Sequence, residues 1–307
     1  MMINLEKRSL IKGHAIKKSP SDVVAIAAAF ILTGGFALVC VLPMCHVLMA
    51  SLSDPIELNL FKGFLFAPLT FSTEGYRLLF SYTNLWRSYL NTVIYTVSAT
   101  SLGLALDLLA AYVLSRKNLM LKRALLIIII IPMLFNGGII PLYMVVRGLG
   151  LTNTMGAMII PACCNTMSII MLKNGMESVH DAICEAAQID GAGHVRILWQ
   201  IMLPLTTAFM ATVVLFNGIG HWNSWVNASM FISASHKDLY PLQLIMRDIL
   251  IDSSTEGVVS PSGYPITFYL ASLRVVMVIV GSLPLIILYP FMQKYFEKGI
   301  IIGGVKG

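Results

Sequence analysis

Long apolar runs dominate the chain and recur at intervals that suit a membrane. Val23–Ser53 contains no formally charged residue, and Leu90–Ser115 contains Asp107 as its single charge. A transmembrane helix needs about 20 predominantly apolar residues, so each of these runs can cross a bilayer. The pattern predicts six transmembrane helices, at about 23–48, 90–115, 124–146, 150–172, 200–221 and 270–293.

A polar stretch interrupts this pattern between the fourth and fifth runs. Ser178 and Asp181 fit the S-x-x-D start of a helix, and negative charge in the first turn suits the helix dipole. Gly191 can take the left-handed conformation that closes a helix, and Gly193 allows a second change of direction. We expect a short helix at about 179–191, parallel to the membrane. Its acidic face is unlike that of a lipid-surface helix, which favours Lys and Arg.

Composition assigns the chain to the integral membrane proteins. Of its 307 residues, 57% are hydrophobic and 12% are charged, with a mean hydropathy of +0.80. Average soluble domains have about 45–50% apolar and about 25% charged residues. We therefore expect an all-α integral membrane fold. The five cysteines show no CxxC spacing, which gives no indication of a metal site or a disulfide framework.

The net charge of +6 is best explained by membrane orientation and not by binding of nucleic acid. The positive-inside rule favours cytoplasmic ends, with residues 1–22 and 294–307 in the cytoplasm and 23–293 forming the membrane domain. It also places the polar helix at 179–191 in the cytoplasm. The proposed cytoplasmic segments hold 14 of the 21 Lys and Arg residues: Lys7, Arg8, Lys12, Lys17, Lys18, Arg116, Lys117, Lys122, Arg123, Lys173, Arg196, Lys294, Lys298 and Lys306.

The polar stretch carries a recognisable motif. Glu185-Ala186-Ala187 is followed after three residues by Gly191, and after nine more by Ile201-x-Leu203-Pro204. This spacing resembles the EAA loop of ABC-importer permeases. The Asp190-Gly191-Ala192 variant and the tail "IIGGVKG" are similar to carbohydrate-uptake permeases of the second maltose permease subunit type. "EGYRLLFSYTNLWRSYLNT" and "WNSWVNASMFI" resemble other segments of such proteins, so the resemblance covers nearly the whole chain.

The resemblance implies a type I ABC-importer permease in a bacterial plasma membrane. Its partners would be a second homologous permease, two cytoplasmic ATPase subunits and an extracellular solute-binding protein or lipoprotein. The cargo would be a carbohydrate, in particular an oligosaccharide. Glu185 would contact the ATPase, Ala186 and Ala187 would fit its cleft, and Gly191 would make the turn. Further coupling residues would be Asp190, Ala192, Gly193, Leu203 and Pro204, and tail contacts to the ATPase would come from Gly303, Gly304, Val305 and Lys306.

The sequence lacks the common nucleotide-binding and hydrolase motifs, which agrees with ATP hydrolysis by separate partner subunits. The sequence contains no GxxxxGK[ST] loop for phosphate and no HExxH or GxSxG motif. We therefore expect a transport subunit that is not an enzyme and binds no cofactor itself. ATP and Mg²⁺ would bind to the partner ATPase subunits.

Two other functions stay open at this point. The cargo of an ABC permease can be a solute other than a sugar. The chain can also be an ion-coupled secondary transporter that uses Asp107, because an acidic residue inside a membrane indicates a functional site. Asn136 and Asn217 interrupt the third and fifth runs beside glycines, and with Asp107 they are candidates for a polar pathway.

Overall fold

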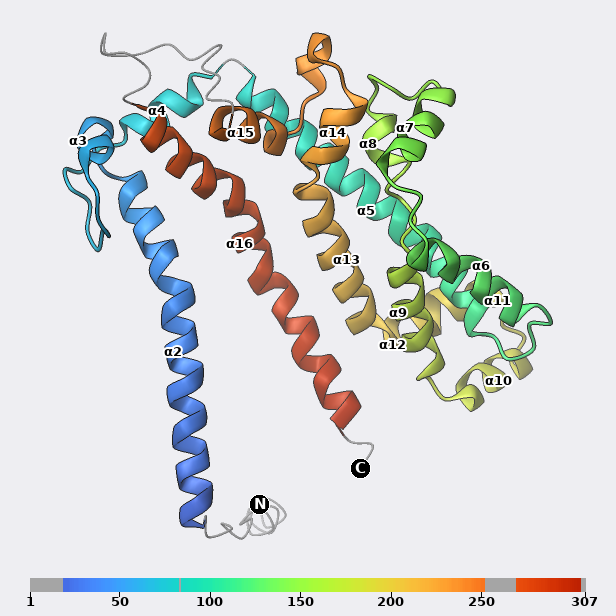
Figure 1. Ribbon diagram of the computed structural model, residues 1–307. Coiled ribbons are helices and arrows are strands. Elements are labelled where there is room, and N and C mark those ends of the chain that lie inside the picture. The colour runs from blue at the N-terminus through green and yellow to red at the C-terminus, as the bar shows by residue number, and fades with distance from the viewer. Residues whose placement is uncertain (1–18, 83, 252–268, 305–307) are drawn as a thin grey trace, which may run out of the picture.

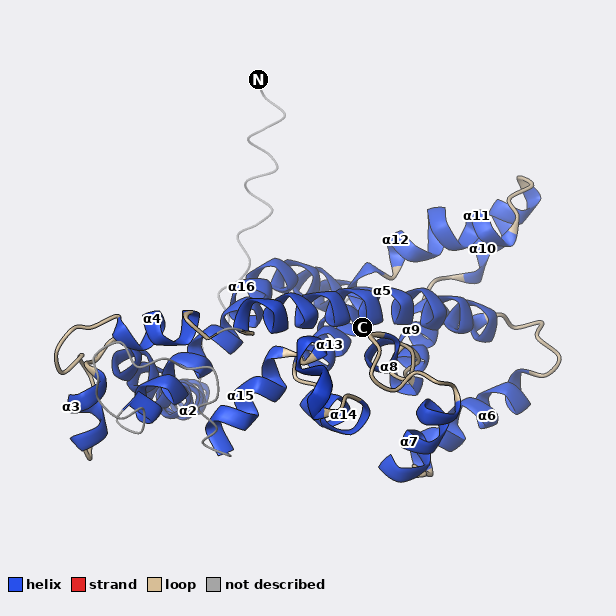
Figure 2. Ribbon diagram, turned by 90° about the horizontal axis from the view of Figure 1, so that it is seen from above, coloured by secondary structure: helices blue, strands red, loops and turns tan. Residues whose placement is uncertain are grey.

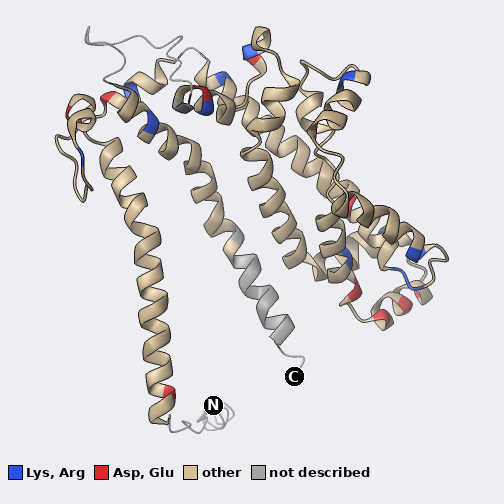
Figure 3. Ribbon diagram, in the orientation of Figure 1, with Lys and Arg blue, Asp and Glu red and all other residues tan. Residues whose placement is uncertain are grey.

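The computed structural model describes residues 19–82, 84–251 and 269–304, and this part of the chain is helical without any β-sheet. Three helices, α2 (Pro20–Ser51), α5 (Leu85–Ser115) and α16 (Leu270–Gly304), are long and apolar enough to cross a membrane unbroken. Figure 1 shows them as the long rods of the molecule. Charged residues gather towards the ends of the long helices and are sparse along their middles (Figure 3). The all-α membrane fold is therefore confirmed.

The remaining expected spans are bent or broken, so the described chain does not contain six continuous helices. The third expected span consists of α6 (Lys122–Leu134) and α7 (Ile139–Gly148), which meet at 113°. Gly138 separates them with a φ of +86°, a conformation that favours glycine, and its N–H donates to the Asn136 side chain at 2.8 Å. Asn136 therefore shapes a turn.

The fourth expected span is split into the short helix α8 (Gly156–Ile159) and α9 (Thr166–Glu177). Pro161 follows the C-cap residue Ile160, and proline cannot donate the hydrogen bond that would continue the helix. Asn165 then caps α9, because its side chain accepts hydrogen bonds from the N–H groups of Met167 and Ser168.

The fifth expected span bends by 81° between the segment His194–Leu205 and α13 (Thr207–Trp222). The first segment comprises α11 (His194–Ile197), the π-helix η1 (Leu198–Met202) and α12 (Leu203–Leu205). Pro204 lacks the N–H that regular α-helical bonding requires. Two residues later, the N–H and the hydroxyl of Thr206 both donate to the Met202 carbonyl, at 2.9 and 2.8 Å. The unbroken part of this span therefore begins at 207 and not at 200.

Several short helices cover the ends of the long helices that lie opposite α10 (Asp181–Ile189). They are α3 (Pro55–Leu60), α4 (Glu74–Phe80), α14 (Trp225–Phe231), the 3-10 turn η2 (Ala234–Leu239) and α15 (Leu242–Ile251). Buried side chains from α4, α5, α15 and α16 share one apolar core there, and the Trp222 indole donates to the Gly281 carbonyl at 2.9 Å. A second core at the opposite end joins α5, α9, α10 and α11.

Helix α2 stands apart from this body (Figure 1), and its residues are exposed until the last turns near Ala50. Ser19 and Asp22 form a capping box at its start. Its 32 residues span roughly 48 Å at 1.5 Å per residue, which exceeds the hydrocarbon thickness of about 30 Å. The start of α2, the end of α16 and α10 all lie towards the same end of the molecule. Helix α16 runs on to Gly304, past the expected domain boundary at 293.

Candidate functional site

The EAA motif lies on α10, a nine-residue helix that projects with α11 and α12 away from α5 (Figure 2). Its inner face packs on the second core through buried Cys184 and half-buried Ala187. The opposite face carries Glu185, Ala186 and Ile189, all of them exposed, and Ile189 is 87% exposed. The two alanines of the motif therefore differ: Ala186 is free to meet another surface, whereas Ala187 is engaged in the core of its own chain.

Helix α10 begins later than its sequence predicts. His180 is the N-cap, and its Nδ1 accepts a hydrogen bond from the N–H of Ala182 at 3.4 Å. Ser178 belongs instead to the end of α9, where its hydroxyl donates to the Gly175 carbonyl at 2.7 Å. The prediction that Ser178 caps this helix is wrong, because the end of the preceding helix already uses its side chain.

The end of α10 follows the prediction. Gly191 has a φ of +81°, and its N–H donates to the Gln188 carbonyl at 3.0 Å. The N–H of Ala192 donates to the Ala187 carbonyl at 2.9 Å, which completes a Schellman motif. Gly193 has a φ of −72° and opens α11, so its conformation is available to any residue.

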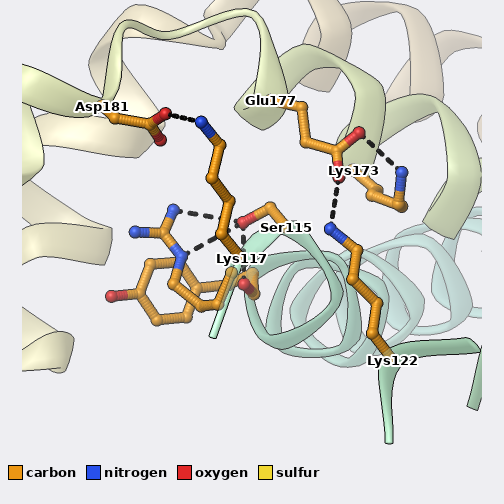
Figure 4. A network of polar contacts seen from close by, with 8 residues as sticks. Ser115, Lys117, Lys122, Lys173, Glu177 and Asp181 are labelled. Carbon is orange, nitrogen blue, oxygen red and sulfur yellow. Dashed lines mark hydrogen bonds and ion pairs between the residues drawn. The ribbon is translucent and has the colours of Figure 1, made fainter. Parts of the chain in front are cut away.

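Ion pairs join α10 to the loop that follows α5, and α9 to the first residue of α6 (Figure 4). Lys117 pairs with Asp181, and this hydrogen bond holds the pKa of the Asp181 carboxyl below its usual value. Glu177 binds Lys122 at 2.8 Å and Lys173 at 2.6 Å. Partial burial alone would raise the pKa of Glu177, but the two lysines together hold it below the usual value.

Aromatic contacts add to this connection. The Tyr112 hydroxyl lies 3.1 Å from Nδ1 of His194, and the Arg116 guanidinium lies 4.5 Å from the centre of the Tyr112 ring. A cleft of about 640 Å³ opens between the end of α5 and α10–α11, lined by Lys117 and Glu185 among others. The contacts of Lys117, Tyr112 and His194 were not predicted from the sequence, since nothing in the local pattern links positions so far apart in the chain.

The remaining residues expected to couple to the ATPase have the following positions. Leu203 is buried in the second core, and Pro204 precedes the 81° bend, so both shape the return into the membrane. Asp190 is exposed at the end of α10, and Ala192 is half-buried. Gly303 and Gly304 end α16, while Val305 and Lys306 lie outside the described residues.

A second polar site lies among α5, α9 and α13. Asp107 is fully buried, and its Oδ1 accepts the Asn165 backbone N–H at 3.3 Å. The Asn217 side-chain oxygen accepts from Ser168 Oγ at 3.2 Å and from Asn165 Nδ2 at 3.5 Å. Two of the three expected pathway residues, Asp107 and Asn217, therefore meet through Asn165, whereas Asn136 lies at the turn between α6 and α7.

Comparisons with known proteins agree on one family. Residues 103–302 match the family described as binding-protein-dependent transport system inner membrane component. The chain is 37% identical to the polygalacturonan/rhamnogalacturonan transport system permease protein YtcP of Bacillus subtilis, over 89% of this chain and 94% of that protein. It is 27% identical to the arabinooligosaccharides transport system permease protein AraQ of Halalkalibacterium halodurans, over 95% of this chain and all of that protein.

A solved structure has the same fold along nearly the whole chain. It belongs to a bacterial ABC transporter involved in the import of the acidic polysaccharide alginate, and it superposes with a TM-score of 0.80 at 30% identity. The match covers 91% of this chain and 99% of that one. The chain therefore belongs to the binding-protein-dependent transport system inner membrane components, the permeases of ABC importers, and it is a transport subunit and not an enzyme.

Proposed function

We propose that the chain is one of two permease subunits of an ATP-driven, binding-protein-dependent importer whose cargo is an oligosaccharide. The cargoes of similar transport proteins support the cargo class, because their names specify polygalacturonan, arabinooligosaccharides and alginate. A chain from a structure of a bacterial alginate ABC transporter, in complex with an alginate pentasaccharide-bound periplasmic protein, shares this fold at a TM-score of 0.59 and 13% identity.

The uncovered face of α10 is the observation that carries the ATP-driven mechanism. Ala186 and Ile189 present small and apolar surface beside the Glu185 carboxylate, and no segment of the described chain covers them. An ATPase subunit with a matching cleft would cover this face, and Glu185 would pair with a basic side chain of that partner. ATP and Mg²⁺ would bind to two such subunits, since this sequence has no phosphate loop.

ATP would act by favouring one arrangement of the docked helices. A partner that binds one conformation better shifts the population towards it, so closure of the ATPases would move α10. The contacts of α10 with α9, α11 and the loop after α5 would pass this movement to the membrane helices. A bacterial plasma membrane with both termini in the cytoplasm fits this scheme, because the described ends of α2 and α16 lie on the side of α10.

Reconstitution tests this function directly. Proteoliposomes would contain this permease, its second permease and the ATPase subunits, with the loaded binding protein outside, and uptake of a labelled oligosaccharide would be measured. We expect uptake only with internal ATP and with binding protein. Uptake that follows a proton gradient and continues without the ATPase would contradict the proposal and favour the Asp107 secondary transporter. Uptake of another solute in place of any sugar would overturn the cargo class alone.

Two tryptophan variants test the role of α10. Ala186→Trp places a bulky ring on the exposed face without disturbing the core of the permease, so we expect loss of ATPase copurification and of uptake. Met120→Trp is the matched control, because Met120 is 99% exposed in the loop between α5 and α6. Normal ATPase binding by Ala186→Trp would contradict the docking face.

A further inference from the structure

We infer that the side chains of Asn165 and Asn217 form a hydrogen-bonding subsite for sugar hydroxyl oxygens inside the membrane, with Ser168 and Asp107 as the positioning residues behind them. This inference rests on the proposed function and adds a place on this chain where the cargo would bind. Asn165 caps the start of α9 and Ser168 lies in its first turn, whereas Asn217 lies on α13 and Asp107 on α5.

The depth of the cluster excludes an ordinary surface role. Asn165 immediately precedes α9, whose 12 residues extend roughly 18 Å to its cytoplasmic end at Glu177. The hydrocarbon core is about 30 Å thick, so Asn165 lies well inside it. Asn165 is nevertheless exposed, and Asn217 is half-exposed.

Exposed amides at this depth do not suit a lipid-facing surface. An unsatisfied polar group in hydrocarbon is unfavourable by several kcal/mol, and polar backbone or side chains at membrane depth are found where they line a cavity or meet protein. The break between α8 and α9 supplies such irregular backbone beside the cluster. This surface of the chain therefore faces a polar pathway.

The hydrogen bonds within the cluster leave the amide NH₂ groups of Asn165 and Asn217 available to a ligand. The Asn165 side-chain oxygen already accepts the Met167 and Ser168 N–H groups, and the Asn217 oxygen accepts from Ser168 and Asn165. The two side-chain NH₂ groups keep free donor capacity, since each amide nitrogen carries two hydrogens. The cluster therefore offers donors with fixed positions, which match the lone pairs of sugar hydroxyl oxygens.

Asp107 fixes this arrangement from inside the protein. Its side chain is fully buried, and Oδ1 holds the Asn165 backbone N–H. Oδ2 has no hydrogen-bond partner among the described residues. A buried polar atom without a partner is unfavourable, so its retention here points to a polar ligand or to water at the cluster.

The subsite is tested with the complete importer in proteoliposomes. Uptake of an oligosaccharide is compared with uptake of deoxy analogues that lack single hydroxyl groups. Asn217→Asp keeps the oxygen that binds Ser168 but replaces the donor group, and Asn217→Leu removes both. We expect half-saturation for the natural cargo to rise roughly threefold to tenfold in each, as for loss of one or two neutral hydrogen bonds. The variants should also lose discrimination against one deoxy analogue.

Thr212→Val is the matched control, because Thr212 lies on α13 and its hydroxyl donates to the Ala208 carbonyl of the same helix. ATPase stimulation by the binding protein should stay normal in all three variants, which separates failure of the subsite from failure of the importer. Unchanged uptake and unchanged discrimination in both Asn217 variants would overturn the subsite. Loss of copurification with the second permease would overturn it as well, since the cluster would then be a subunit contact.

Discussion

At the scale of single residues, two glycines of the EAA segment have different roles. Gly191 adopts a φ of +81° with open space around its Cβ position, so its importance lies in the backbone and not in packing. We expect Gly191→Ala to destabilise the end of α10 by about 1–2 kcal/mol, the strain of a left-handed alanine. Thermal unfolding of the purified permease in detergent should show a lower midpoint.

Gly193 provides the control for this prediction. It also has open space, but its φ of −72° suits any residue. Gly193→Ala should leave the midpoint of thermal unfolding unchanged. Equal effects of the two substitutions would contradict the assignment of the Schellman turn to Gly191.

The ion pairs of Glu177 should make the stability of the fold depend on pH. Its pKa is lower in the folded protein, so its ion pairs stabilise the fold above the ordinary Glu pKa of about 4.3 and lose this effect as pH falls through the lower folded value. We expect Glu177→Gln to unfold at a lower temperature than the unchanged protein at pH 7, and the difference to vanish in stronger acid. The difference should shrink in a Lys122→Met background, and a difference that grows in acid would contradict this sign.

At the scale of elements, the segment between α8 and α9 packs closely against α5 at Gly103. A Cβ added at Gly103 would lie 2.6 Å from the Cys163 carbonyl oxygen, which belongs to backbone and cannot rotate away. Gly103→Ala should therefore lower the unfolding midpoint, although alanine favours helices over glycine by about 1 kcal/mol. The packing clash outweighs the gain in propensity.

Gly220→Ala is the control for this element, because Gly220 lies in α13 with no atom within 4 Å of its Cβ position. It gains the same helix propensity without a clash, so its midpoint should stay or rise. A stabilised Gly103→Ala variant would show that α8 and α9 shift freely against α5.

At the scale of the whole molecule, both termini should lie in the cytoplasm. In intact cells, tags at either end should resist added protease, whereas a tag inserted after Ser235, in the exposed turn η2, should be cleaved. The physical reason is the positive-inside bias, which comes largely from the terminal segments. Cleavage of a terminal tag with protection at 235 would reverse the orientation and remove α10 from the ATPase side.

The sequence by itself determined the membrane class, the family motif and the helix stop at Gly191. These features depend on local quantities: the length of an apolar run against bilayer thickness, and the backbone freedom of one glycine. The long helices α2, α5 and α16 follow from the same reasoning.

Only the tertiary structure decided which face of α10 is free, that Ser178 closes α9, and that Asp107 meets Asn217 through Asn165. The signals for the breaks, Pro161 and Pro204, are visible in the sequence, but the apolar runs continue through them and conceal the bends. Contacts between residues far apart in the chain depend on how whole helices pack, and the apolar pattern of a single membrane helix contains little information about its neighbours.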